Sequence, residues 1–138
     1  MVMSNSIENT ANLQRWRAAL EETGLAETLR GEGPFTIFAP IDTAFDRLPE
    51  NLRRISREDA DRWKRIIAYH IGFGDVRSDD LAQITEVMTM EGSVIAVERD
   101  GGKFKLNDAT VITPDILVDN AVIHVIDTVL SPALVLTE

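Results

Sequence analysis

Apolar residues in the first part of the chain recur at the spacing of an α-helix. Leu13, Trp16 and Leu20 fall on one helical face. Gly24 comes next, and glycine commonly ends a helix because it adopts the left-handed conformation without strain. A second, shorter helix is expected over residues 25–30. The amino-terminal part of the chain is therefore predicted to be helical.

The longest helical pattern lies in the middle of the chain. Ser56 followed by Asp59 resembles a capping box and is expected to open this helix. Gly72 and Gly74 are expected to close it. Its apolar residues share one face, which predicts a helix packed against a core. These apolar residues are Ala60, Trp63, Ile66 and Ile67, and His70 lies at the end of the same stripe.

A strand and a short helix are predicted before this long helix. Residues 34–39 are rich in aromatic and β-branched side chains, and Pro40 is expected to end the strand. Asp42 then stands as an N-cap for a short helix that ends before Pro49. The apolar residues of the short helix are Ala44, Phe45 and Leu48.

Beyond Leu81 the apolar residues form short β-type runs separated by turn residues. The segment Asp100-Gly101-Gly102 predicts a hairpin, and Pro114-Asp115 predicts a turn. A helical first half with one early strand, followed by a strand-rich second half, favours the α+β class over repeated βαβ units. The expected strands are residues 87–90, 94–97, 104–106, 111–112 and 122–129.

Composition is typical of one folded domain. Hydrophobic residues make up 44% and charged residues 27% of the 138 residues. A chain of this length usually forms one domain, so we expect a single domain over residues 1–138. No apolar run approaches the ~18 residues that a membrane-spanning helix needs.

The charge of the chain argues against nucleic acid as a partner. Lys and Arg together number 14 and Asp and Glu 23, which gives a net charge of −9. Phosphate backbones and anionic lipids are bound mainly by clustered cations. Basic residues do gather between Arg53 and Arg65, but they alternate with acidic residues. That pattern indicates a solvated helix face with ion pairs.

Candidate catalytic or metal-binding residues are few. The chain has no cysteine, and its two histidines, His70 and His124, lie in apolar segments where a buried, hydrogen-bonded imidazole is expected. Signatures of nucleophile elbows and phosphate-binding loops are missing. We therefore expect no catalysis, no metal site and no cofactor. A hydrolase that uses either histidine beside a carboxylate is a weaker hypothesis.

Three segments in order resemble the signature blocks of fasciclin domains. Residues 33–45 resemble the first block, Tyr69-His70 the family's Tyr-His motif, and residues 120–127 the second block. The resemblance covers about residues 9–132. It implies a wedge-shaped β-sandwich with helices packed along one side. The signature residues expected to build the fold are Thr36, Phe38, Pro40, Asp42, Phe45, Asn120, His124 and Asp127.

The same resemblance implies adhesion through protein–protein contact with a cell-surface or matrix protein, without catalysis. Its candidate determinants are the pair Asp115-Ile116 and the pair Tyr69-His70. An exposed Asp115 carboxylate after a proline can complete the coordination of a partner's divalent cation. The competing interpretation is that Asp115 only makes a turn and Ile116 only fills the core.

The sequence leaves more than one interpretation open for the location and the role of the protein. The resemblance implies the cell surface, the extracellular space or the periplasm. Residues 1–5 show neither the basic nor the apolar region of a signal peptide, so a cytoplasmic protein and an exported mature form are both compatible with the sequence. The alternative function is an intracellular or periplasmic domain that binds a partner or a small ligand and has no adhesion role.

Overall fold

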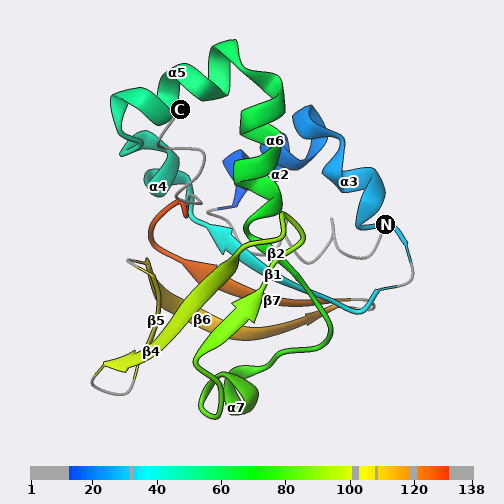
Figure 1. The fold of residues 1–138 in the computed structure, drawn as a ribbon, viewed down its shortest axis with the longest axis vertical. Coiled ribbons are helices and arrows are strands. Elements are labelled where there is room, and N and C mark those ends of the chain that lie inside the picture. The colour runs from blue at the N-terminus through cyan, green and yellow to red at the C-terminus, as the bar shows by residue number, and fades with distance from the viewer. Residues whose placement is uncertain (1–12, 32, 101–102, 108, 119–120, 131–138) are drawn as a thin grey trace.

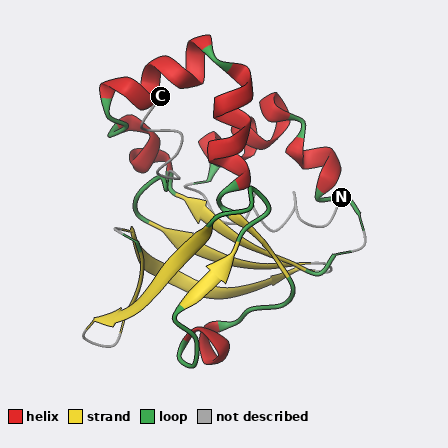
Figure 2. Cartoon of the chain, in the orientation of Figure 1, coloured by secondary structure: helices red, strands yellow, loops and turns green. Residues whose placement is uncertain are grey.

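The helices gather on one side of the strands, except for one short helix at the opposite end (Figures 1 and 2). The structure is a computed structural model that describes residues 13–31, 33–100, 103–107, 109–118 and 121–130. Its helices are α2 (Gln14–Thr23), α3 (Leu25–Thr28), α4 (Asp42–Asp46), α5 (Glu50–Glu58), α6 (Ala60–Ala68) and α7 (Ser78–Leu81).

The strands form one seven-stranded sheet in the order β2-β1-β7-β6-β5-β4-β3. The central strands β1 and β7 are parallel, and every other neighbouring pair is antiparallel. A bridge between Gly72 and Thr89 links the two ends of the sheet, so the sheet nearly closes into a barrel. The strands are β1 (Phe35–Pro40), β2 (Ile71–Phe73), β3 (Glu86–Met88), β4 (Val94–Asp100), β5 (Lys103–Leu106), β6 (Ala109–Val118) and β7 (Ala121–Ile126).

Two apolar cores lie on opposite faces of β1 and β7. In β1, Phe35 and Ile37 face the helices, and Phe38 faces the inside of the curled sheet. The helix-side core includes Trp16, Phe45, Trp63, Ile37 and Ile123. The inner core includes Phe38, Leu81, Ile95, Leu106 and Ile126. Strands with both faces covered, and helices packed along one side, confirm the predicted α+β fold.

The long helical pattern begins later than predicted, because a boundary between two helices lies at Asp59 and not at Ser56. Ser56 lies inside α5, where its hydroxyl donates to the Arg53 carbonyl. Asp59 is the N-cap of α6, because its carboxylate accepts the Arg62 backbone N–H at 3.1 Å. The helix also ends earlier than predicted, at Ala68. Gly72, one of the two glycines expected to close it, lies in β2.

The predicted N-cap at Asp42 was also wrong, for a reason that lies in another helix. Ile41 is the N-cap of α4, and Asp42 is its first helical residue. The Asp42 carboxylate instead accepts the backbone N–H of Arg15 at 2.8 Å. Arg15 is near the start of α2, where backbone N–H groups lack partners within the helix. Asp42 therefore caps α2 from a distance.

The strand-rich half contains the predicted hairpin, but two of its strands differ from the prediction. Asp100 pairs with Lys103, so the predicted hairpin is present, although Gly101 and Gly102 lie outside the described residues. The strand predicted at 111–112 extends over ten residues, and Pro114-Asp115, predicted as a turn, lies within it. The last strand ends at Ile126 rather than at Val129.

Candidate functional site

Asp115 lies where β6 departs from regular pairing with β7. Thr113 pairs with Val125 and Ile116 with Ile123, so β6 holds one extra residue across this interval. Such a bulge tolerates the proline that precedes Asp115, since a bulged residue makes no regular ladder bond. Asp115 has a φ of 59°, a left-handed conformation that aspartate adopts more readily than most residues.

The Asp115 carboxylate reaches the start of α7. It accepts the Ser78 backbone N–H at 2.8 Å and the Ser78 hydroxyl through its other oxygen. Partial burial raises the pKa of Asp115, but the hydrogen bonds from Ser78 and the charges of His124 and Arg77 outweigh this effect and lower the pKa below its ordinary value. The carboxylate is therefore ionised throughout the neutral pH range. Because the residue is exposed, this negative charge lies at the surface.

His124 connects Asp115 to the loop before α7. Its Nδ1 accepts the Asp115 backbone N–H at 3.3 Å, and its Nε2–H donates to the Val76 carbonyl at 2.8 Å. The ring also stacks on Phe38, with centroids 5.6 Å apart. Burial lowers the pKa of His124, against the opposing effects of the Val76 carbonyl and Asp115. The ring is therefore neutral, with its proton on Nε2, at neutral pH.

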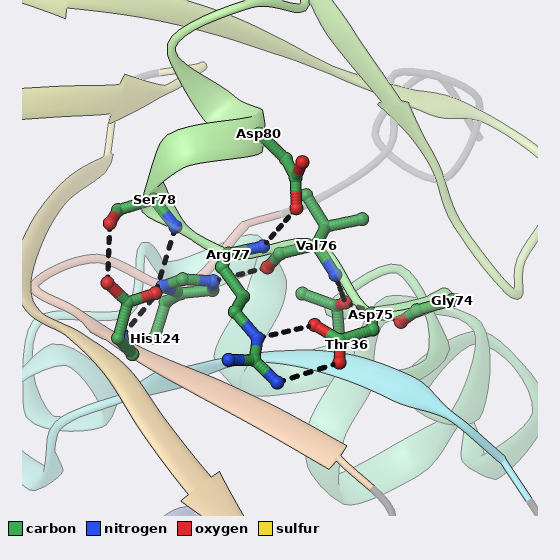
Figure 3. A network of polar contacts seen from close by, with 9 residues as sticks. Thr36, Gly74, Asp75, Val76, Arg77, Ser78, Asp80 and His124 are labelled. Carbon is green, nitrogen blue, oxygen red and sulfur yellow. Dashed lines mark hydrogen bonds and ion pairs between the residues drawn. The ribbon is translucent and has the colours of Figure 1, made fainter.

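Thr36 of β1 holds the same loop in place through two hydrogen bonds. Its hydroxyl donates to the Gly74 carbonyl at 2.7 Å and accepts the Val76 backbone N–H at 2.9 Å. The loop is closed on its outer side by Arg77, which donates twice to the Asp75 carboxylate. Those hydrogen bonds lower the pKa of Asp75. Figure 3 shows how residues of the strands converge on this loop.

Tyr69 and His70, the other predicted determinants, are buried and not at the surface. The Tyr69 hydroxyl donates to the Val94 carbonyl at 2.6 Å. His70 is 0% exposed, donates to the Ile66 carbonyl and accepts the Leu130 backbone N–H, each at 2.8 Å. Burial lowers the pKa of His70 to about 4. Neither side chain presents a surface to a partner in this conformation.

Ile116 has an intermediate position beside Asp115. It is partly buried and packs against the helix-side core. The structure thus brings Asp115 together with Ser78 and His124, and leaves Tyr69 and His70 in a different part of the molecule. Ser78 and Thr36 are site residues that the sequence analysis did not connect to Asp115.

The remaining signature residues support the fold. Phe38 and Phe45 are buried, and Pro40 is the last residue of β1, inside the strand that it was expected to end. The Asp127 carboxylate accepts the Thr110 backbone N–H at 2.9 Å. Asn120 lies outside the described residues.

Ser78, Asp115 and His124 lie together, but their bonding differs from that of a catalytic triad. In a triad the carboxylate binds histidine, and histidine accepts the serine proton. Here the carboxylate binds Ser78 directly, and the His124 Nε2–H is committed to a backbone carbonyl. Among the residues that the structure describes, no three His, Cys, Asp or Glu side chains are placed to hold a metal ion. Within those same ranges no helix is long and apolar enough to cross a membrane.

Comparison with known proteins identifies relatives of the whole domain. Residues 11–132 match the model of the fasciclin domain family. The chain is 38% identical to protein sll1735 of Synechocystis sp. over 131 residues, which are 93% of this chain and 98% of that protein. It is 33% identical to pig transforming growth factor-beta-induced protein ig-h3, and 32% identical to human periostin. These alignments span 17% and 15% of those longer proteins.

A solved structure shares the fold. It is a FAS1 domain pair from the insect cell adhesion molecule fasciclin I, with a TM-score of 0.70 over 88% of this chain and 46% of that chain. At 23% sequence identity this likeness concerns the fold alone. The family match and the close similarity to sll1735 show that the chain belongs to the fasciclin domain family.

Proposed function

We propose that this domain is a non-catalytic adhesion module that binds a cell-surface or matrix protein. Membership of the fasciclin family supports the proposal, since that family includes the domains of the insect cell adhesion molecule fasciclin I. These relatives favour adhesion over the alternative of an intracellular or periplasmic domain without an adhesion role. The observation that carries the proposal is the ionised Asp115 carboxylate on an exposed bulge of β6.

The Asp115 carboxylate has capacity for a further ligand. A carboxylate offers about four lone-pair positions, and the backbone and hydroxyl of Ser78 use two of them. The free positions suit a divalent cation held by the partner, since such cations prefer oxygen ligands. Ser78 holds the carboxylate and His124 holds the backbone N–H of the same residue, so the site is fixed in advance, which reduces the entropy lost on binding.

Other residues have supporting roles in this proposal. Ile116 anchors the bulge to the helix-side core, while Tyr69 and His70 hold the fold together from inside. An adhesion role places the domain at the cell surface, in the extracellular space or in the periplasm. Among the four predicted determinants, Asp115 is therefore the one whose change should affect adhesion without loss of the fold.

The direct test is the substitution Asp115→Asn. Asparagine keeps the size of the side chain and tolerates positive φ. Its carbonyl oxygen can accept the Ser78 backbone N–H, and its amide N–H can donate to the Ser78 hydroxyl oxygen. We expect attachment of cells to surfaces coated with the variant to fall about tenfold, because the charge that binds the cation is lost. Chelation of divalent cations should reduce attachment to the wild-type domain to the same level.

Asp79→Asn is the matched control. Asp79 is an exposed carboxylate in the first turn of α7, close to Ser78 in the chain, so this variant has the same net charge as Asp115→Asn. It should attach cells like the wild type. Equal attachment by the wild type and a folded Asp115→Asn variant would rule out the Asp115 site. Equal losses in the two variants would point to a general charge effect instead.

A further inference from the structure

The helices other than α7 gather at the end of the molecule opposite α7 (Figure 1). A pocket lies among them. Its outer part has a volume of about 390 Å³ and its inner part about 220 Å³. Both parts share walls from α2, α4 and α5, and the inner part reaches α6. The outer part alone is within the usual size range of small-molecule sites.

The floor of this helical pocket is apolar and aromatic. Phe45 and Leu48 line both parts, and Trp63 lines the inner part. Trp63 packs edge-on against Phe45 with ring centroids 6.4 Å apart, which fixes both rings. A flat apolar group can lie on such a floor, where it would lose contact with water.

The rim of the pocket is positively charged in an otherwise acidic chain. The outer part is lined by Arg15, Arg53 and Arg57 with one carboxylate, Asp46, so its formal charge is 3 − 1 = +2. The inner part adds Glu22, which brings the whole pocket to 3 − 2 = +1. The chain as a whole carries −9. Charge complementarity therefore favours an anion.

Two of the three arginines are already positioned, and the third is free. Arg15 donates to the Asp46 carboxylate at 2.6 Å and lies over the Phe45 ring at 5.6 Å. Arg53 donates to the Asp46 backbone carbonyl at 2.7 Å. The Arg57 side chain makes no hydrogen bond or ion pair with any residue in the described ranges. Its guanidinium is thus available for a carboxylate or phosphate, which it can bind through two parallel hydrogen bonds.

From this combination we propose that the helical pocket binds a small organic anion with a flat apolar body. The acid group meets Arg57, with Arg15 and Arg53 adding to the attraction. The body lies against Leu48 and toward Trp63, beside the Arg15 guanidinium that covers one face of the Phe45 ring. This site is separate from Asp115 and is independent of the proposed adhesion. A ligand bound there packs α2 and α5 together, so it also stabilises the helical side of the domain.

The two tryptophans provide an internal comparison for the test. Trp63 lines the pocket, whereas Trp16 packs against His70 with centroids 5.4 Å apart and does not line either part. The indole N–H groups of both are buried without a hydrogen-bond acceptor among the described residues. Each indole N–H gives its own NMR signal. A ligand in the pocket should shift the Trp63 signal and leave the Trp16 signal in place.

The experiment titrates the domain with naphthalene-2-carboxylate, followed by NMR and by isothermal titration calorimetry. We expect a saturable shift of the Trp63 indole signal. Uncharged naphthalene-2-methanol should bind at least tenfold more weakly, because it cannot pair with Arg57. Benzenephosphonate distinguishes a preference for phosphate-type groups from one for carboxylates. Inorganic phosphate, which lacks the apolar body, should bind at least tenfold more weakly than either organic acid.

Arg57→Gln and Arg54→Gln form the matched pair of variants. Both residues are exposed on α5, both changes remove one positive charge, and only Arg57 lines the pocket. Arg57→Gln should weaken naphthalene-2-carboxylate binding at least tenfold, and Arg54→Gln less than twofold. Equal weakening by both variants, equal binding of the uncharged alcohol, or no saturable shift of the Trp63 signal at millimolar concentrations would each overturn the proposal.

Discussion

Each buried histidine of this domain bridges two backbone groups through one donor and one acceptor nitrogen. His70 joins the Ile66 carbonyl to the Leu130 N–H, and His124 joins the Val76 carbonyl to the Asp115 N–H. Protonation would turn the acceptor nitrogen into a donor facing another N–H. Both rings therefore make these hydrogen bonds in the neutral form, and protonation in acid would break the one that each ring accepts.

This arrangement predicts a loss of stability in mild acid. The pKa of folded His70 is about 4, against 6.5 in the unfolded chain, so the unfolded chain takes up the proton first as the pH falls. The contribution of the neutral His70 ring to stability is complete above pH 6.5 and declines toward pH 4. The free energy of unfolding falls by about 3 kcal/mol over this range. Urea unfolding between pH 7 and pH 4 measures it.

Two measurements separate His70 from other acid-sensitive groups. His70→Gln should unfold with a smaller pH dependence over this range, because glutamine can bridge the same groups without titrating. In the wild type, the His70 ring should remain neutral at pH 5.5 by NMR. A ring that titrates near pH 6.5 would refute the prediction.

The surroundings of Asp115 show which part of a site a sequence can disclose. Its acidic side chain after a proline suggested an exposed turn. The residue is exposed, but it lies at a bulge within β6 and not in a turn. Its partner Ser78 is 37 positions away, and the contact depends on how α7 meets the bulge in β6. No local spacing encodes such a contact. The burial of Tyr69 likewise depends on the curled sheet, since Tyr69 packs in the inner core. The burial of His70 agrees with the expectation from its apolar segment.

At the scale of elements, burial on both faces makes a strand easy to predict. β1 and β7 are buried at every position, since the two cores cover opposite faces. α5 was missed because only Leu52 and Ile55 on it are buried and the remaining residues are mostly charged or polar. Its weak apolar signal led the sequence analysis to place the helix start at Ser56.

The boundary between α5 and α6 can be tested by removing each candidate cap. Asp59→Ala should lower the free energy of unfolding by about 1 kcal/mol, because the Arg62 N–H loses its acceptor. Ser56→Ala should change it by less than about 0.5 kcal/mol, since Ser56 bonds only within α5. Chemical unfolding of both variants decides the matter. A larger effect at Ser56 would contradict the observed boundary.

At the scale of the whole molecule, closure of the sheet depends on the close approach of β2 to β3. A methyl group at Gly72 would lie 3.2 Å from the Met88 carbonyl oxygen and 3.2 Å from a Val87 methyl group. The carbonyl is backbone and cannot move without disturbing β3. Next to this contact the Met90 N–H donates to the Ile71 carbonyl at 2.6 Å. Together these contacts between β2 and residues 87–90 form the seam at which the sheet closes.

Gly72→Ala should therefore open the seam. We expect the free energy of unfolding to fall by about 1–3 kcal/mol, because the added methyl group forces the strands apart. Hydrogen exchange at the Met90 amide should accelerate more than exchange in β1, which lies deeper in the sheet. Unchanged protection of Met90 in the variant would show that the seam accommodates the methyl group.

The pairing of β1 with β7 also governs when the domain can form during protein synthesis. Phe35 of β1 lies beside Ala121 of β7, so the centre of the sheet joins segments from opposite ends of the chain. A ribosome must release nearly the entire domain before this pair exists, and until then β1 lacks its main neighbour and both cores lack a wall. The nascent chain therefore carries an unprotected strand edge for most of its synthesis, which makes it a natural client for chaperones.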